Sequence, residues 1–216
     1  MATIAIIGGT GPEGRGLGLR WAMAGHSVVL GSRSAARGAE AANEIRELAP
    51  GIDVGGAENE DAVNAADWVV LSVPYEGLDS TVLTLGHALE GKIIICVVAP
   101  LDFTGGRPRA LSIAEGSAAE LVQERIPGAR VTSAFQNLSA HELLEPGKVL
   151  EGDVLVCGDD VEAKAHTIDL ADSMKDLRGI DGGPLANSRT VEGLTALILH
   201  VNRQTKGRAT VKLLGI

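Results

Sequence analysis

Short apolar runs alternate with amphipathic stretches along most of the chain. The apolar runs predict strands at residues 2–7, 27–30, 53–55, 68–73, 92–98, 129–134, 153–157 and 179–181. Helices are predicted between them, at residues 15–24, 40–48, 60–65, 78–89, 114–124 and 161–177, and in a last long helix after the turn at 182–184. This order of elements predicts an α/β fold, a doubly wound Rossmann-type parallel sheet. Residues 99–113 and 135–146 are irregular, and a loop as long as the first is usually functional or mobile.

The turn between the first strand and the first helix contains a G-x-G-x-x-G motif, made by Gly9, Gly11 and Gly14. In this context the glycines allow a tight turn, the approach of a pyrophosphate and close packing of helix on strand. The phosphates would then lie at the positive end of the helix. A glycine-rich turn can also serve packing alone, but the flanking strand and helix favour a dinucleotide site.

The end of the second strand indicates which dinucleotide is bound. An NAD site usually has an acidic residue here, whereas this chain has Ser32 and Arg33, with Arg37 one helical turn further on. Guanidinium groups make charge-assisted, bidentate contacts with phosphate oxygens. The sequence therefore predicts NADP, whose 2′-phosphate these residues would hold. Residues 1–148 would form the NADP-binding Rossmann domain. Residues 149–216 would form a small C-terminal α/β lobe that completes the substrate cleft and the dimer interface.

Composition excludes several other classes of protein. Apolar residues make up 45% of the 216 residues and aromatic residues only 2%, so the core must consist of small and branched aliphatic side chains. The net charge of −9 makes nucleic acid and anionic membranes poor partners. We expect a soluble, cytoplasmic protein, because no apolar run could span a bilayer and the first residues predict a strand. Cys96 and Cys157 lie in apolar runs and are expected in the core, and the histidines show no metal-ligand spacing.

Basic residues gather at the end of the chain, at Arg203, Lys206, Arg208 and Lys212, with no acidic residue among them. They could receive an anionic substrate tail. They could equally be solvated charges at a helix C-terminus, where the helix dipole favours cations.

No nucleophile elbow, carboxylate pair or metal-ligand spacing is present, and this absence is compatible with hydride transfer between two bound molecules that carry their own chemistry. Asn187, Ser188 and Arg189 begin the last helix and could contact a substrate oxygen or phosphate, or cap the helix. Gln136 could bind a ring carbonyl or amide, or could only satisfy the loop backbone. The arginines of the first irregular stretch, Arg107 and Arg109, could meet anions or remain solvated.

Several motifs in the same order resemble the NADPH-dependent F420 reductase family, also called F420H2:NADP oxidoreductases. They lie at residues 8–11, 31–33, 59–62, 71–76, 115–120, 131–135, 156–160, 181–189 and 191–195, and so cover nearly the whole chain. The resemblance implies hydride transfer between NADP and the deazaflavin coenzyme F420, commonly in a homodimer. Tyr75 stands where an aromatic residue is usual, whereas the pair Gln136 and Asn137 departs from the usual His or Asn followed by a small or β-branched residue.

The same resemblance implies roles for individual residues. Thr10, Gly11, Pro12 and Glu13 would hold the pyrophosphate, and Ser32, Arg33 and Arg37 the 2′-phosphate. The adenosine and nicotinamide sides of the cleft would be lined by Val73, Gly77, Ala99 and Ala140. Gln136 and Leu138 would flank the contact between the nicotinamide and the deazaflavin.

Two alternatives remain open from the sequence. One is an NADP-dependent reductase of another small acceptor, such as an imine or a flavin. The other is an NADP-binding sensor domain without turnover, which would need no second cleft. The last helix has apolar residues outside its main stripe, Leu197 and Leu199, and these could be buried in a subunit interface or within one chain.

Overall fold

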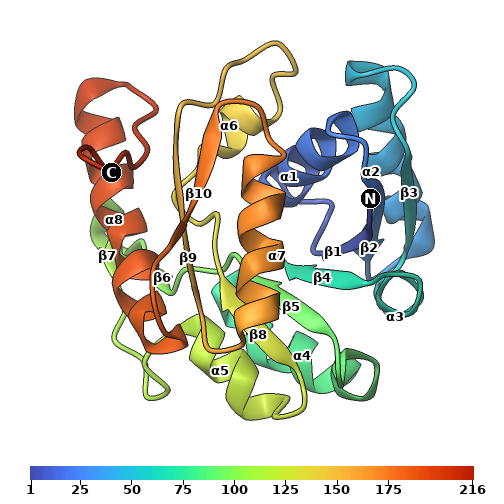
Figure 1. The fold of residues 1–216 in the computed structure, drawn as a ribbon, viewed down its shortest axis with the longest axis horizontal. Coiled ribbons are helices and arrows are strands. Elements are labelled where there is room, and N and C mark those ends of the chain that lie inside the picture. The colour runs from blue at the N-terminus through green and yellow to red at the C-terminus, as the bar shows by residue number, and fades with distance from the viewer.

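One eight-stranded sheet runs through the computed structural model, which describes residues 1–216. The strand order is β10-β9-β8-β5-β4-β1-β2-β3, and helices cover both faces (Figure 1). The strands are β1 (Thr3–Ile7), β2 (Ser27–Ser32), β3 (Val54–Glu58), β4 (Trp68–Leu71), β5 (Ile93–Cys96), β8 (Arg130–Ser133), β9 (Gly152–Gly158) and β10 (Leu177–Asp181). The sheet extends from β1 in both directions, so the loops that follow β1 and β4 diverge at one edge.

The direction of the last two strands differs from the expected parallel sheet. Neighbouring strands from β3 to β8 pair in parallel, but β8 pairs antiparallel with β9, through Thr132 opposite Gly158 and Ser133 opposite Cys157. β10 is parallel to β9. The segment after β8 therefore starts β9 from the edge at which β8 ends and needs no crossover. The strands after residue 148, expected in a small lobe, extend the same sheet.

The helices are α1 (Pro12–Met23), α2 (Ala35–Leu48), α3 (Asn59–Asn64), α4 (Tyr75–Leu89), α5 (Ala118–Arg125), α6 (Ala140–Leu143), α7 (Val161–Asp172) and α8 (Ser188–Thr205). The irregular stretch after β5 contains a small antiparallel ribbon of β6 (Leu101–Asp102) and β7 (Arg109–Ala110), joined by the 3-10 turn η1 (Thr104–Gly106). A second 3-10 turn, η2 (Leu185–Asn187), leads into α8.

Local backbone chemistry explains where three helices differ from prediction. α2 begins at residue 35 instead of 40, directly after Ser34 in an extended conformation. α5 begins at 118 instead of 114, because Gly116 has a φ of +99° and the Ser117 side chain caps the helix by accepting from the Glu120 N–H at 3.0 Å. α7 ends at 172 instead of 177, since Leu177 already belongs to β10.

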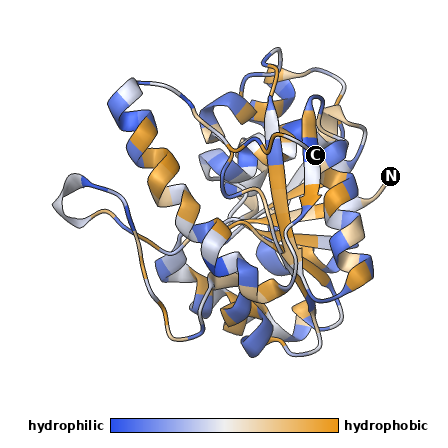
Figure 2. Cartoon of the chain, turned by 60° about the vertical axis from the view of Figure 1, so that its left-hand side comes forward, coloured by the Kyte–Doolittle hydropathy of each residue, from blue (hydrophilic) through white to orange (hydrophobic).

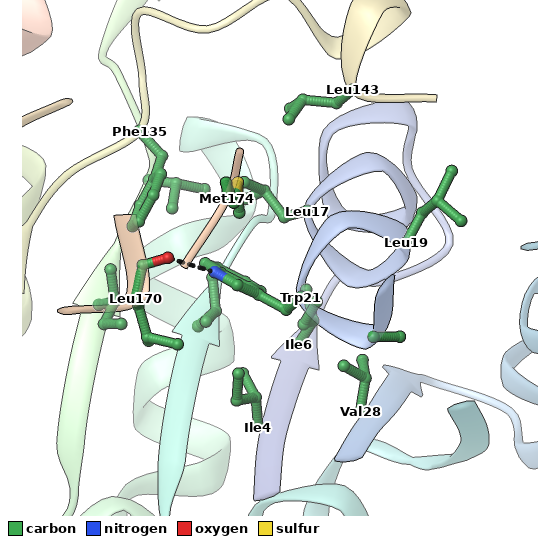
Figure 3. Close-up of a cluster of buried hydrophobic side chains, with 14 of the residues drawn as sticks. Ile4, Ile6, Leu17, Leu19, Trp21, Val28, Phe135, Leu143, Leu170 and Met174 are labelled. Atoms are coloured by element: carbon green, nitrogen blue, oxygen red, sulfur yellow. Dashed lines mark hydrogen bonds between the residues drawn. The ribbon is translucent and has the colours of Figure 1, made fainter. Parts of the chain in front are cut away.

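Two apolar clusters sandwich the sheet. One packs α1, α2 and α7 on one face, and the other packs α3, α4 and α5 on the opposite face. In the first cluster the rings of Trp21 and Phe135 meet edge to face at 5.3 Å, and Trp21 Nε1 donates to the Leu170 carbonyl at 3.2 Å (Figure 3). Figure 2 shows the apolar strands enclosed between helices that carry hydrophilic outer faces. Cys96 and Cys157 are both buried, as expected.

Helix α8 differs from the prediction for its apolar face. Val191 and Ile198 are buried, but Val201 is 39% exposed. Leu197, which lies outside the main apolar stripe of the helix, is 61% exposed. The first half of the helix is therefore packed within this chain, and its second half presents apolar side chains to solvent.

Candidate functional site

The glycine-rich loop joins β1 to α1 at the edge where the loops diverge. Gly8 has a φ of +80°, which an L side chain rarely adopts. The Gly9 N–H donates to the carbonyls of Ile6 and Gly31, both at 3.1 Å, and a Cβ on Gly14 would lie 2.8 Å from the Gly9 Cα. The first and third glycines of the motif therefore serve close packing of the loop and helix.

The second glycine, Gly11, is less confined, because a Cβ there would meet only the Gly8 carbonyl oxygen, at 3.4 Å. Gly11 occupies the N-cap position of α1, Pro12 follows it, and no side chain caps the helix. The first turn of an α-helix has N–H groups without partners inside the helix, and the helix dipole favours an anion there. A pyrophosphate therefore fits this end of α1 both in charge and in space.

A continuous groove crosses the loop at Gly11. On one side lies a cavity of about 540 Å³ lined by Gly8, Thr10, Gly11, Ser32, Arg33, Arg37, Asn59, Ser72, Val73, Pro74, Gly77, Ser80 and Thr81. On the other side lies a cavity of about 350 Å³, here called the inner chamber, lined by Gly11, Pro12, Glu13, Ser72, Val73, Pro74, Tyr75, Glu76, Val97, Val98, Ala99, Leu101, Phe103, Gln136 and Thr195. The two cavities share the residues at Gly11 and at 72–74, so an elongated ligand could pass from one into the other.

The first cavity can accept an anion. Arg33 and Arg37 are exposed and form no ion pair within the chain, so both guanidinium groups are available to a ligand. Ser32 is buried at the end of β2, beside them along the chain. A third cavity of about 320 Å³ adjoins this end and shares Ser32, Arg33 and Asn59. Asn59 has a buried Oδ1 atom without a hydrogen-bond partner.

The inner chamber is mostly apolar and has one oriented amide. The Gln136 Nε2 donates to the Cys96 carbonyl at 3.2 Å and to Ser133 Oγ at 2.6 Å. Its Oε1 is buried and has no partner. A buried acceptor without a donor is costly, so a ligand N–H at this point would be favourable. A carboxamide such as that of nicotinamide has a suitable donor.

Two acids near the groove are shielded from solvent, Glu192 almost completely and Glu13 in part, and this burial raises the pKa of both. The pKa of Glu13, in the first turn of α1, is raised to about 8. The pKa of Glu192, in α8, is raised to about 7, although its carboxylate accepts from the N–H groups of Ala118 at 2.8 Å and Ala119 at 3.1 Å. Glu192 thus joins α8 to the N-terminus of α5, and α8 contributes Thr195 to the inner chamber.

Three of the residues expected to line the cleft instead contact the elements that form its wall. The Asn137 Nδ2 donates to the Val191 carbonyl at 3.2 Å and to Thr195 Oγ1 at 2.9 Å. Leu138 packs against the first apolar cluster. Ala140 begins α6, and its carbonyl would lie 3.4 Å from a Cβ placed on Gly16 of α1. None of the three lines either of the two joined cavities.

Asn187, Ser188 and Arg189 also lie outside these cavities. The Asn187 Nδ2 donates to the Gly182 carbonyl at 2.7 Å and makes no cap bond to α8. Ser188 is fully buried, and Arg189 pairs with Glu120 at 2.7 Å. Asn187 occupies the N-cap position of α8 without a side-chain cap bond, and η2 packs against β9. A substrate contact by these three residues stays a prediction.

The basic residues near the end of the chain mostly have partners. Arg208 pairs with Glu145 and Lys212 with Glu151, and the Arg203 guanidinium donates to the Gly106 carbonyl. Arg109 pairs with Asp102 at 2.5 Å. These contacts join the C-terminal segment to neighbouring loops and to the ribbon, close the ribbon on itself, and leave little free positive charge for an anionic tail.

Sequence reasoning missed several lining residues. Phe103, Ser80 and Thr81 line the cavities but belong to no recognised local pattern, because distant parts of the chain bring them to the groove. Thr195 lies in the motif at 191–195 but was given no role in the site. Asn59 had a signal, since it starts the motif at 59–62, but it was given no role in the site.

No helix in the structure is both long enough and apolar enough to cross a membrane.

Comparisons with known proteins show the family of this chain. The family model described as NADP oxidoreductase, coenzyme F420-dependent, matches residues 3–100. An F420-dependent NADP reductase from Methanocaldococcus jannaschii is 41% identical over 213 residues, which cover 96% of this chain and 95% of the relative. Another from Methanothermobacter thermautotrophicus is 38% identical, with 95% of this chain and 91% of the relative covered.

A solved structure extends the comparison to the whole fold. That structure is of a proposed F420-dependent NADP reductase from Arthrobacter sp. FB24. It superposes on the present chain with a TM-score of 0.83 at 25% identity, and both chains are fully covered. Similarity along nearly the full length, in sequence and in fold, therefore shows that the chain belongs to the F420-dependent NADP reductase family.

Proposed function

We propose that this protein transfers a hydride directly between NADP(H) and the deazaflavin coenzyme F420. The observation that carries the proposal is the continuous groove, which has two unpaired arginines at one end and an apolar chamber with an unpartnered amide oxygen at the other. The N-terminus of α1 lies between these ends. Relatives named F420-dependent NADP reductases match nearly the entire chain, which favours this activity over an imine or flavin reductase and over a sensor.

In the proposed cofactor path, the adenosine half of NADP lies in the cavity beside Ser32, Arg33 and Arg37, and these residues hold the 2′-phosphate. The pyrophosphate crosses Thr10 and Gly11 at the start of α1, with Val73 and Gly77 on the opposite wall. The nicotinamide then enters the inner chamber. This order follows from the general placement of dinucleotides across the carboxyl ends of strands in such sheets.

Within the inner chamber, Gln136 is the proposed positioning residue. Its Oε1 would accept from the nicotinamide carboxamide, while Nε2 stays bonded to the Cys96 carbonyl and Ser133 Oγ. Ala99 and Phe103 would form apolar walls that exclude water from the reacting rings. Asn137 and Leu138 act behind this wall by holding the loop.

The two bound coenzymes supply the hydride donor and acceptor carbons. The chain's part is to bind both, to orient their rings and to keep water out. Holding the two reacting carbons about 3–3.5 Å apart accounts for much of the acceleration expected from such an enzyme. No side chain needs to act as a nucleophile.

We also propose that the chain forms a homodimer through the second half of α8. Leu197 and Val201 expose apolar surface there. On the neighbouring ribbon, which contacts α8, Phe103 is also exposed. Apolar side chains gathered on one face of a protein are typical of an interaction surface.

The direct test mixes the purified protein with NADPH and oxidised F420 and follows the loss of the deazaflavin's visible absorbance. We expect rapid bleaching with NADPH and much slower bleaching with NADH. NADPH binding without bleaching would overturn the F420 assignment, and would favour another small acceptor or a sensor role. Absence of NADPH binding would overturn the cofactor path as well.

A further inference from the structure

Glu13 is a carboxyl group for which the hydride transfer gives no reason. It occupies the first turn of α1 and lines the inner chamber together with Gln136 and Thr195. Its Oε1 is shielded from solvent and has no hydrogen-bond partner. Glu13 as a whole is partly buried, but an ionised carboxylate with a shielded, unpartnered oxygen is unfavourable, so in the free protein the group favours its uncharged form.

No cationic side chain neutralises Glu13, and the N-terminal end of α1 offers it only partial positive charge. The strands beneath α1, β1 and β2, carry no ionisable side chain. Ionisable groups do occur on α1, on the elements packed around it and in the lining of the chamber. They include Arg15, Arg20, Glu44, Glu58, Tyr75, Glu76, His141 and Glu142. Of the cations, Arg15 pairs with Glu44, and the Arg20 guanidinium donates to loop carbonyls. Burial alone therefore raises the pKa of Glu13, to about 8.

The ligand proposed for this chamber changes its charge in the reaction. The nicotinamide ring is neutral when reduced and cationic when oxidised. In a low-dielectric chamber, a carboxylate nearby stabilises the cation considerably more than it would in water. An uncharged carboxylic acid has no such preference, and can pack against either ring.

We propose that Glu13 discriminates between the two redox states of the bound cofactor, as a carboxylate beside the cationic oxidised ring and as an uncharged acid beside the neutral reduced ring. This inference rests on the cofactor path proposed above. Binding of NADP⁺ then releases a fraction of a proton per site from Glu13 near neutral pH, whereas binding of NADPH releases none. By linkage, rising pH favours NADP⁺ over NADPH.

The test measures binding alone, without F420. Calorimetric titrations at pH 7, in two buffers that differ in ionisation enthalpy, count the protons released by NADP⁺ and by NADPH. Titrations at pH 6.5 and pH 9 give the ratio of the two affinities. Groups that both cofactors share, including the 2′-phosphate, contribute equally to both titrations and cancel in this comparison.

For the wild-type protein we expect about 0.4 proton released with NADP⁺ at pH 7 and none with NADPH, because one unit of coupling lowers the pKa of Glu13 from about 8 to about 7. The affinity ratio should shift toward NADP⁺ by about tenfold between the two pH values, which corresponds to one pKa unit of coupling. In Glu13→Gln the proton release and the shift should both disappear. Glu47→Gln, which removes an exposed carboxylate on α2 outside both cavities, should keep the wild-type behaviour.

Three results would overturn the inference. They are equal proton release with both cofactors, an equal loss of affinity for both at high pH, and a tenfold shift that persists in Glu13→Gln. If Glu13→Gln fails to fold, the same titrations on Glu13→Leu, together with the proton count of the wild-type protein, still test the inference. A protein that shows the proton difference but does not bleach F420 would contradict the proposed function and leave this inference standing. A protein that binds neither cofactor would contradict both.

Discussion

At the scale of single residues, the unpaired cations at the end of β2 decide the choice of dinucleotide. Arg33 and Arg37 line the cavity beside Ser32 and have no acidic partner in the chain. The β2 end also has no carboxylate at residues 31–33, so it offers no acceptor to the free ribose hydroxyl of NAD. Charge and hydrogen-bonding capacity therefore both favour a phosphorylated ribose.

Replacement Arg33→Ala should weaken NADP binding by about 10- to 100-fold, the effect expected from losing a charge-assisted contact with phosphate. NAD, which lacks that phosphate, should lose less than about threefold by the same reasoning. Titration calorimetry with both dinucleotides checks this. Arg130→Ala is the matched control, because Arg130 lies at the opposite end of the strands, paired with Glu162. Equal losses for NADP and NAD would mean that Arg33 does not read the 2′-phosphate.

Phe135 shows how one strained residue orients the site. Its φ is +73°, a left-handed conformation that is unusual for a bulky side chain. The edge-to-face contact with Trp21 and the bond from Trp21 Nε1 to the Leu170 carbonyl anchor the ring in the core (Figure 3). The backbone then turns directly after β8, and Gln136 reaches back to the end of β5. Packing energy in the core thus sustains a conformation that serves the inner chamber.

At the scale of elements, the short helix α6 depends on a single buried arginine. A helix of four residues is too short to be stable by itself. From α1, the Arg20 guanidinium donates to the carbonyls of Glu142 at 2.7 Å, Leu143 at 2.9 Å, Glu145 at 2.6 Å and Lys148 at 2.9 Å. Arg20 is 8% exposed, so these bonds are largely shielded from water. It therefore joins the loop after β8 to the helix that carries the glycine motif.

Replacement Arg20→Met should lower the free energy of unfolding by about 2–4 kcal/mol, because it leaves several buried carbonyl oxygens without a donor. Urea denaturation followed by circular dichroism measures this. Arg46→Met on α2 is the control, since its exposed guanidinium bonds only Asn43, and we expect a change within about 0.5 kcal/mol. A similar small change in both variants would show that Arg20 does not hold the loop.

At the scale of the whole molecule, the sheet order creates the groove. β1 is central, with β2 and β3 on one side and β4 and β5 on the other. The loops after β1 and β4 separate at this point, and a crevice opens at the carboxyl ends of the strands. The antiparallel β9 and β10 extend the far side of the sheet, and α8 returns from there to contribute Thr195 to the inner chamber. The site therefore combines both halves of the chain.

The proposed dimer is tested at the same scale. Leu197→Glu should shift the molecular mass measured by light scattering, at micromolar protein concentration, from two chains toward one, because a charge would be buried at the interface. Leu83→Glu is the control, since Leu83 is 60% exposed on α4, close to the 61% of Leu197 on α8. A wild-type mass of one chain would contradict the dimer. An unchanged two-chain mass in Leu197→Glu would place the interface elsewhere.

Local chemistry in the sequence determined the glycine turn, the cationic end of β2 and most strands and helices. Each of these depends on neighbouring residues, because turn geometry, β-branched runs and helical periodicity act over short distances. The assignment to NADP followed from the same short segments.

Only the tertiary structure decided the features that depend on contacts between distant residues. The reversed direction of β9 reflects how the segment after β8 returns along the sheet, which no local pattern encodes. The segment of Asn187, Ser188 and Arg189 turns toward its own chain because η2 packs on β9. Phe103 and Thr195 reach the inner chamber only when the ribbon and α8 are in place. The partial burial of Glu13, and hence its raised pKa, likewise comes from packing around α1 that the sequence alone did not reveal.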